Sequence, residues 1–223
     1  KNINNDKLEE KCFESFNSEY YSAINTYINE KVLIRIIEKE YLIKSIKEIS
    51  LIRNEIFLSK YLTHKNILRL YEIIESKYYI FLVYEHFKGE LITSFLKKRT
   101  KLSDKEILLI LHGILNALLY LHESMKIGHL GLNLQNILID NNCKVKIINF
   151  YKSCFYQDKT NAVLSLDDNT FFFAAPEVHA KLDYYPELVD VYSSGIIVYY
   201  LCTGTLPFNS TTKVLTQQLI MKG

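Results

Sequence analysis

The sequence predicts an α+β fold of two lobes, with a small β-rich first lobe, a larger helical second lobe and a cleft between them. In the first half, residues 31–37 and 78–85 are short runs of β-branched and aromatic residues, which are typical of strands. In the second half, residues 103–124 and 189–204 have the apolar character of long helices. The change from strands to helices falls in a connecting stretch near residues 84–90.

Two helices are predicted from periodicity and start signals. Residues 50–62 repeat apolar side chains at helical spacing, so we expect a helix between the two strands of the first lobe. Helix 103–124 begins at Ser103, and Glu106 follows at the spacing of a capping box. These signals fix where the main helix of the second lobe starts.

The rest of the second half is predicted from turns and breakers. Residues 136–140 and 144–150 are expected to pair as short strands around a tight turn. Residues 152–173 show no clear period and are expected to form a long loop, which in compact domains is usually functional or mobile. Gly204 ends the last predicted helix, with Pro207 just beyond it.

Composition limits the classes of partner. The chain has 223 residues, 48% of them hydrophobic, and a formal net charge of +2. This excludes a chain that is disordered by composition and gives no reason to expect nucleic acid as the main partner. The most apolar run, residues 106–125, contains His112, Asn116 and His122, so we expect a buried core helix and no membrane span.

Cysteine usage favours a reducing compartment. No pair of cysteines has the CxxC spacing of a zinc or redox site, and no secretory signal is recognised. The four cysteines are Cys12, Cys143, Cys154 and Cys202. We expect reduced thiols and an intracellular, cytoplasmic protein.

A series of short motifs occurs in order along the chain, and each resembles a motif of the protein kinases. The motifs are VLIR (Val32 to Arg35), Glu55, LVYEHFKGE with Tyr84 at the gatekeeper position, HLGLNLQN (His129 to Asn136), INFY (Ile148 to Tyr151), AAPE (Ala174 to Glu177), DVYSSG (Asp190 to Gly195) and GTLPF (Gly204 to Phe208). Over essentially its full length the chain resembles a protein kinase domain, most closely the calmodulin-dependent and AMP-activated-kinase-like Ser/Thr branch.

The resemblance implies one bilobal domain over residues 1–223. Its N-lobe would cover about residues 1–84, its hinge residues 85–89 and its C-lobe residues 90–223. The sequence given stops before the position of the family's last helices.

The glycine loop that covers the phosphates in the family is not recognisable. The first glycine of the chain is Gly89, and the candidate segment carries Glu14, Phe16, Asn17 and Tyr20 in its place. Backbone with bulky or acidic side chains cannot approach phosphates as glycine does. The segment is expected to be an ordinary hairpin at the edge of the small lobe.

The nucleotide positions implied by the resemblance are altered. Arg35 stands at the lysine position, where it keeps a charge that can pair with Glu55, although Lys-to-Arg is not conservative at a phosphate site. Leu33 replaces a small residue above the adenine, and Leu138 would form the floor. Nucleotide-binding residues, if there are any, would be Arg35, Glu55, Leu138 and the hinge backbone of Glu85 and Phe87.

The catalytic positions are altered more severely. Gly131 occupies the position of the catalytic Asp, so no catalytic residue is expected there. Asn136 and Asn149 occupy the magnesium-ligand positions, and neutral amides hold Mg²⁺ poorly. Leu130 replaces the Arg that reads a phosphorylated loop in the family, and Tyr151 replaces a hinge glycine.

The architectural residues are retained. His129 and Phe150 match the family's stacked regulatory spine, with Leu70 as an expected neighbour. Asp190 is expected to anchor the catalytic-loop backbone, and Thr170 keeps a position that in the family touches the catalytic Asp and Lys. The scaffold is therefore kept where the reactive groups are not.

The leading hypothesis is a pseudokinase with little or no phosphotransfer, acting as a scaffold or allosteric regulator of a protein partner such as an active kinase or its substrate. Loop 152–173 could display a docking patch, or Phe171 to Phe173 could pack beneath it; both remain open. No cofactor is expected.

Two alternatives remain. The first is an active or weakly active ATP-dependent Ser/Thr kinase that uses a carboxylate from elsewhere, for which Glu55, Asp140 and Asp158 are the nearby candidates. The second is weak binding of ATP, with or without Mg²⁺, and no turnover.

Overall fold

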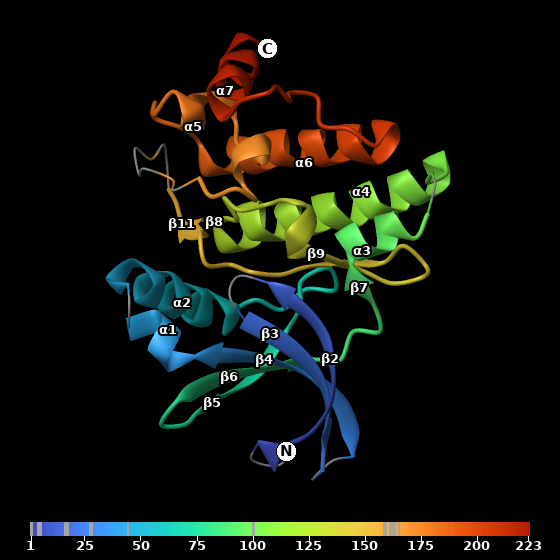
Figure 1. The fold of residues 1–223 in the computed structure, drawn as a ribbon, viewed down its shortest axis with the longest axis vertical. Coiled ribbons are helices and arrows are strands. Elements are labelled where there is room, and N and C mark those ends of the chain that lie inside the picture. The colour runs from blue at the N-terminus through green and yellow to red at the C-terminus, as the bar shows by residue number, and fades with distance from the viewer. Residues whose placement is uncertain are drawn as a thin grey trace.

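The computed structural model describes residues 2–3, 6–15, 18–26, 29–43, 45–99, 101–157, 160, 164 and 166–223. Three residues named above, Phe16, Asn17 and Asp158, lie outside this set. Figure 1 shows a strand-rich part built mainly from the first half of the chain and a helical part built from the second. The predicted α+β class is confirmed.

The strand-rich part is built on one six-stranded antiparallel sheet with the order β1-β2-β3-β4-β6-β5. Its strands are β1 (Asn2–Ile3), β2 (Asp6–Ser15), β3 (Ser18–Asn25), β4 (Glu30–Glu38), β5 (Leu70–Glu75) and β6 (Tyr79–Glu85). The two predicted strands are β4 and β6, and they pair with each other. The candidate loop segment is the β2–β3 hairpin, as expected. Val32, Leu33, Ile34 and Arg35 of β4 are all buried, because helices and neighbouring segments cover both faces of this strand.

Helices α1 (Lys39–Ile43) and α2 (Ile46–Ser59) follow β4. Helix α2 is the predicted helix, and it begins and ends earlier than its apolar pattern indicates. The Ser45 side chain accepts a hydrogen bond from the backbone N–H of Glu48 at 3.4 Å, which caps the start of the helix. The buried face of α2 carries Ile52, Glu55 and Leu58, so one charged residue points inward among apolar ones.

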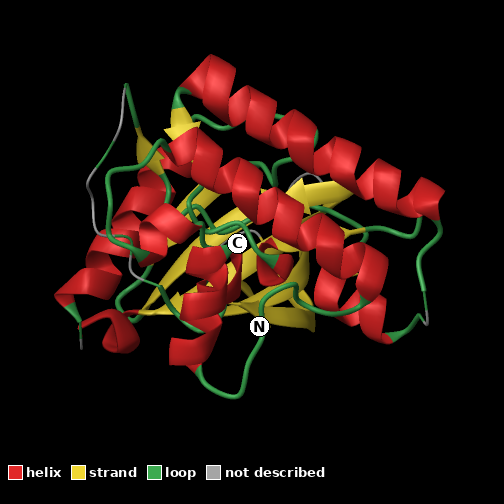
Figure 2. Ribbon diagram, turned by 90° about the horizontal axis from the view of Figure 1, so that it is seen from above, coloured by secondary structure: helices red, strands yellow, loops and turns green. Residues whose placement is uncertain are grey.

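The second part consists of helices with short strands between them. The helices are α3 (Ile92–Lys97), α4 (Asp104–Leu119), the π-helix η1 (Tyr120–Met125), the 3₁₀ helices η2 (Leu134–Asn136) and η3 (Phe171–Phe173), α5 (Pro176–His179), α6 (Pro186–Thr203) and α7 (Lys213–Lys222). The short strands are β7 (Glu90–Leu91), β8 (Ile127–Gly128), β9 (Ile137–Ile139), β10 (Val145–Ile147) and β11 (Cys154–Phe155). Figure 2, viewed from above, shows these helices in front of the sheet, and Figure 1 shows that they lie toward the opposite end of the molecule from it.

Local signals in this part were accurate. The predicted capping box is present: Ser103 Oγ accepts from Glu106 N at 3.3 Å, and Glu106 Oε2 accepts from Ser103 N at 2.8 Å. The predicted strand pair is β9 with β10. Asp140 closes their turn by accepting from Asn142 N at 2.8 Å. The same oxygen of Asp140 also accepts from Lys144 N at 2.9 Å.

The predicted long loop contains more structure than expected. β11 pairs with β8, and η3 covers Phe171 to Phe173. Phe173 is buried, and Phe171 and Phe172 are half-buried against each other and against the helical core. Of the two alternatives for this aromatic run, packing is therefore the observed one.

Helix α4 continues into η1, and together they form one described helix that is long and apolar enough to cross a membrane. Its inward face, including Ile107, Ile110 and Ile114, joins Ile196 and Ile197 of α6 in the main core cluster. The apolar character of α4 is thus explained in large part by core packing, as expected from its internal polar residues.

The end of α6 gives a test of this description. Gly204 follows the helix with φ 76°, and its N–H donates to Tyr200 O at 2.8 Å. Gly204→Ala is expected to lower the free energy of unfolding by about 1–2 kcal/mol, because side chains disfavour this left-handed conformation. Gly195→Ala in the same helix is the control: an added Cβ there meets nothing within 4 Å, so stability should rise by up to about 1 kcal/mol. Urea denaturation measures the free energy of unfolding of both variants. An equal change in the two would contradict the left-handed helix end at Gly204.

Candidate functional site

Arg35 lies at the centre of the candidate site, fully buried beneath the sheet. Its NH1 atom is 2.8 Å from Glu55 Oε2, and its Nε donates to Ser18 Oγ at 2.6 Å. Burial acts against the charge, but Glu55 and neighbouring tyrosines outweigh it, and the pKa of Arg35 is raised above its ordinary value. The predicted Arg35–Glu55 ion pair is present, through one guanidinium nitrogen at hydrogen-bond distance.

Glu55 also holds the segment that follows β10. Its Oε1 accepts from the backbone N–H of Phe150 at 3.2 Å. Beside it on α2, the Asn54 amide donates to Ser153 O at 2.6 Å. The Phe150 ring meets the His129 ring edge-on at 4.9 Å between centroids. Side chains of α2 therefore fix the position of residues 149–153 without any bound ligand.

Asn149 connects the two parts of the molecule. Its Oδ1 accepts from Tyr20 OH at 3.0 Å and lies 3.4 Å from Arg35 NH1. Its Nδ2 donates to Ser15 Oγ at 2.8 Å and to Asn136 Oδ1 at 2.7 Å. Its φ of 66° is a left-handed conformation that Asn tolerates better than most residues. Both ends of the amide are thus engaged by protein groups.

The orientation of this amide follows from its neighbours. The Gly131 carbonyl can only accept, so Asn136 must turn its NH₂ group toward it, at 2.6 Å. Asn136 Oδ1 then faces Asn149, which must present its own NH₂ group there. At the other end the guanidinium of Arg35 can only donate, which again requires Asn149 Oδ1 on that side. Both ends of the network select the same arrangement.

This arrangement does not suit a cation. The two residues at the expected magnesium-ligand positions bond to each other, so an N–H group points at Asn136 Oδ1 where a metal ion would need a free oxygen. Among the described residues no group of three or more His, Cys, Asp or Glu side chains could hold a metal ion. The residues present therefore do not fit Mg²⁺.

The residues expected to contact a nucleotide base pack against one another. Leu33 and Leu138, the predicted roof and floor, belong to one buried cluster with Tyr20 and Tyr84. Tyr20 is 1% exposed and stacks on Phe13 at 4.4 Å between centroids. Burial raises the pKa of the Tyr20 hydroxyl, so it stays protonated and can donate to Asn149. The predicted crowding by Leu33 is reinforced by Tyr20, whose role the sequence did not reveal.

That the hinge backbone of Glu85 and Phe87 binds a nucleotide stays a prediction; in the structure the Glu85 N–H donates to Arg69 O at 2.9 Å. Glu85 Oε1 lies 2.6 Å from Lys146 Nζ, and it also accepts from Arg69 N at 2.8 Å. The Phe87 carbonyl accepts from Gly89 N at 2.9 Å. The Phe87 side chain packs against the buried cluster of Leu33 and Leu138. These contacts tie the residues that connect the two parts to neighbouring segments of the protein.

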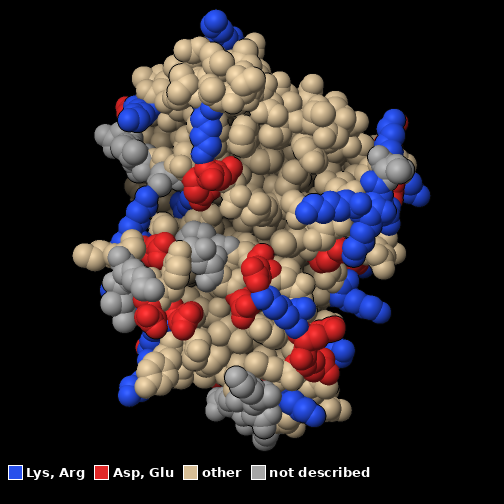
Figure 3. All heavy atoms as spheres, viewed as in Figure 1, with Lys and Arg blue, Asp and Glu red and all other residues tan. Residues whose placement is uncertain are grey.

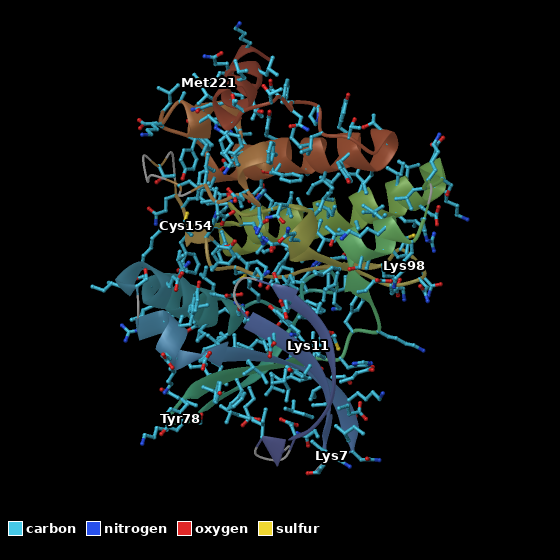
Figure 4. All side chains as sticks on the ribbon, viewed as in Figure 1. Lys7, Lys11, Tyr78, Lys98, Cys154 and Met221 are labelled. Atoms are coloured by element: carbon cyan, nitrogen blue, oxygen red, sulfur yellow. The ribbon has the colours of Figure 1, made fainter. Side chains whose placement is uncertain are left out.

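The mouth of the cleft is acidic. A hollow of 590 Å³ opens there, and the described part of its wall includes Glu14, Glu19 and Glu38 but no Lys or Arg. Lys11 on β2 (labelled in Figure 4) pairs with both Glu14 and Glu19. Acidic and basic side chains are interspersed over the strands on the face drawn in Figure 3. An entrance lined by carboxylates is unfavourable for phosphate.

Gly131 lies on a well-ordered loop that retains its anchor. Asp190, fully buried on α6, accepts from the backbone N–H groups of His129 at 2.7 Å and Leu130 at 2.8 Å, as predicted. A Cβ atom added at Gly131 would meet Lys152 and His129 only at ordinary van der Waals distances, 3.6 and 3.7 Å. There is therefore room for a Cβ atom at position 131, and steric exclusion does not explain the glycine.

A cluster that the sequence did not reveal lies beside Gly131. Lys152 Nζ is 2.8 Å from Asp167 Oδ2 and donates to Thr170 Oγ1 at 2.7 Å. The Thr170 hydroxyl also lies 2.9 Å from Asp167 Oδ1. Burial raises the pKa of Asp167, but Lys152 and Thr170 outweigh it, and the pKa is lowered. The sequence indicated Thr170 through the resemblance, whereas the Asp-x-x-Thr spacing of a local turn was the only signal for Asp167.

The Arg35–Glu55 pair gives a test of the site. Arg35→Met is expected to lower the free energy of unfolding by about 3–5 kcal/mol, because it leaves the Glu55 carboxylate buried without its cation. Adding Glu55→Gln should recover part of this loss, since a neutral amide oxygen can still accept from Phe150 N. Urea denaturation of the single and double variants measures both effects. A double variant less stable than Arg35→Met would show that the charge pair is not the controlling interaction.

Comparison with known proteins is consistent with this geometry. The family model described as "Protein kinase domain" matches residues 16–223. The chain is 32% identical over 187 residues to the SNF1-related protein kinase catalytic subunit alpha KIN12 of Arabidopsis thaliana, covering 84% of this chain and 37% of that protein. It is 33% identical over 193 residues to serine/threonine-protein kinase SIK1 of Mus musculus, covering 86% of this chain and 24% of that protein.

A third relative is CBL-interacting protein kinase 11 of Oryza sativa subsp. japonica, 32% identical over 190 residues, with 85% of this chain and 38% of the relative covered. The chain thus spans well under half the length of these relatives. The buried ion pair, the anchored loop and the matched sequence agree on one family. The chain belongs to the protein kinase family, among relatives that are serine/threonine protein kinases.

Proposed function

We propose that this chain is a pseudokinase: a kinase fold that acts on protein partners by shape and not by phosphoryl transfer. The observation that carries the proposal is the Asn136–Asn149 amide pair, closed at 2.7 Å and tied to Arg35. In the family, phosphoryl transfer depends on charge stabilisation by metal ions and on a positioned carboxylate. Here the metal positions bond to each other, and Gly131 supplies no carboxylate.

The nucleotide position supports the same proposal. Leu33, Tyr20 and Leu138 form one buried cluster where the base would lie, and the mouth is lined by glutamates. Placing ATP there requires large apolar side chains to move out of a packed core, which is costly. The residues present therefore do not fit ATP with Mg²⁺.

The internal contacts favour a scaffold or an allosteric regulator. Glu55 and Asn54 hold residues 149–153 against α2 by direct hydrogen bonds. A domain whose central segment is held by its own side chains presents one constant surface to a partner. We propose that the partner is a protein inside the cell, an active kinase or its substrate, and that residues 1–223 act as one domain hinged at 85–89.

A thermal-shift titration tests this function. Millimolar ATP, alone or with Mg²⁺ or Mn²⁺, is expected to leave the unfolding midpoint unchanged. A ligand at a hundredfold excess over its Kd would stabilise the folded state by about 2.7 kcal/mol, which is readily measured. A shift that needs the metal would contradict the pseudokinase proposal. A shift with ATP alone would instead support nucleotide binding without turnover.

The matched variant for this titration is Asn149→Asp. It removes the N–H that occupies Asn136 Oδ1 and places a carboxylate beside that oxygen, which is the donor type that Mg²⁺ prefers. We expect the variant to gain a Mg²⁺-dependent rise in midpoint that the wild-type chain lacks. This outcome would show that the amide itself, and not the surrounding fold, excludes the metal.

A second candidate function is residual Ser/Thr kinase activity, and one observation favours it. Lys152, Asp167 and Thr170 bring an ammonium group, a carboxylate and a hydroxyl together beside Gly131. The side chain of Asp167 is 39% exposed, so a substrate hydroxyl can reach it. In this function Asp167 would accept the hydroxyl proton in place of the missing aspartate.

Asp167→Asn decides between the two functions if any phosphotransfer to a protein substrate is measured. Loss of a general base should lower the rate about 10²–10⁴-fold. Asp168→Asn is the control. The Asp168 carboxylate is 84% exposed and pairs only with Lys213 among the described residues. A rate that is equal in both variants would remove Asp167 from consideration, and no rate in the wild type would leave the pseudokinase proposal standing.

A further inference from the structure

A hollow of 380 Å³ lies on the helical part, away from the cleft. Its walls come from three places in the chain: loop 152–173, α5 with the turn after it, and α7 (Figure 1). Such a volume accommodates one or two large side chains of a partner. Leu164 and Leu166 of its wall also lie against Gly131 and Thr170, so the hollow borders the candidate site.

Five of the ten described residues that line the hollow are apolar. Leu164, Leu166 and Val178 line the hollow together with Leu182. Leu164, Leu166 and Val178 belong to a buried cluster around Leu130, so they are held in place from behind. Leu182 is 60% exposed at the rim. An exposed leucine at the edge of an apolar hollow favours an occupant that continues across the surface, as a polypeptide does.

The charged groups of the lining are both cations. Among the described residues, Lys181 and Lys213 contribute to the wall, and no carboxylate does. Lys213 pairs with Asp168, whereas Lys181 is exposed and forms no ion pair with a described residue. An acidic group on an occupant is therefore complementary to this rim.

A buried acceptor at the wall remains without a partner. The His179 ring lines the hollow and is 5% exposed. Its Nε2 lies 3.0 Å from Phe171 O, which fixes the proton on that nitrogen. Its Nδ1 has no hydrogen-bond partner among the described residues, and burial lowers the pKa of the ring, so Nδ1 stays an acceptor. Such groups are rare in folded proteins and favour a functional role for this wall.

We propose that this hollow is a docking site for a polypeptide segment of a partner protein, in which one large apolar side chain inserts between Leu164, Leu166 and Leu182 and a flanking carboxylate pairs with Lys181. The inference rests on the proposed function, because a pseudokinase acts through bound proteins, and it gives that function a place and a partner chemistry.

The experiment is a selection of phage-displayed random peptides on the 223-residue chain, with counter-selection on the Lys181→Glu/Leu182→Asp variant. Both residues are exposed, so the variant is expected to fold, and its circular dichroism and unfolding midpoint verify this. Enriched peptides should combine Leu, Ile or Phe with Asp or Glu. In fluorescence anisotropy a synthetic copy should bind the double variant about ten- to a hundredfold more weakly, the loss expected for one apolar anchor and one ion pair.

Leu108→Asp on α4 is the matched control, since Leu108 is 64% exposed and distant in the fold. It should bind the same peptide with unchanged affinity. Enrichment of basic or purely polar peptides, no enrichment over the counter-selection, or equal weakening in the control would overturn the docking site. None of these outcomes bears on the ATP titration, so the two proposals fail separately.

Discussion

The buried pair of Arg35 and Glu55 is the interaction on which the rest of the structure depends. An ion pair with both members at most 1% exposed must be compensated on all sides, since an uncompensated charge in this environment costs several kcal/mol. Ser18 and Asn149 supply acceptors to Arg35, and Phe150 N supplies a donor to Glu55. The sheet, helix α2 and the segment after β10 are therefore joined through one charge pair.

The altered positions form a consistent set when they are considered around this pair. An aspartate at position 149 would add a second carboxylate to a site that already contains Glu55, and a cation would be needed to balance it. Asparagine keeps the acceptor that faces Arg35 and adds a donor that satisfies Asn136 and Ser15. Tyr20 then fills the remaining space with a ring and a hydroxyl. Hydrogen bonds within the protein thus engage both ends of the Asn149 amide.

The sequence predicted the elements whose signals are local. The capping box at Ser103 and the glycine end of α6 at Gly204 were correct because each depends on residues within a few positions. The start of α2 was placed too late, since Ser45 caps it before the apolar pattern begins. The Arg35–Glu55 pair could be predicted only through a motif, because 20 residues separate its members.

The sequence by itself determined which residues stand at the positions compared with the family: no glycine before Gly89, Gly131 where a carboxylate is expected and Asn149 where a charged ligand is expected. A side chain that is not encoded cannot be supplied by folding at that position. Only the tertiary structure decided what surrounds these positions. Tyr20 reaches Asn149 across 129 residues, and Lys152, Asp167 and Thr170 gather beside Gly131 from a segment without periodicity. Contacts of this kind depend on how strands and loops pack in space, which spacing along the chain does not specify.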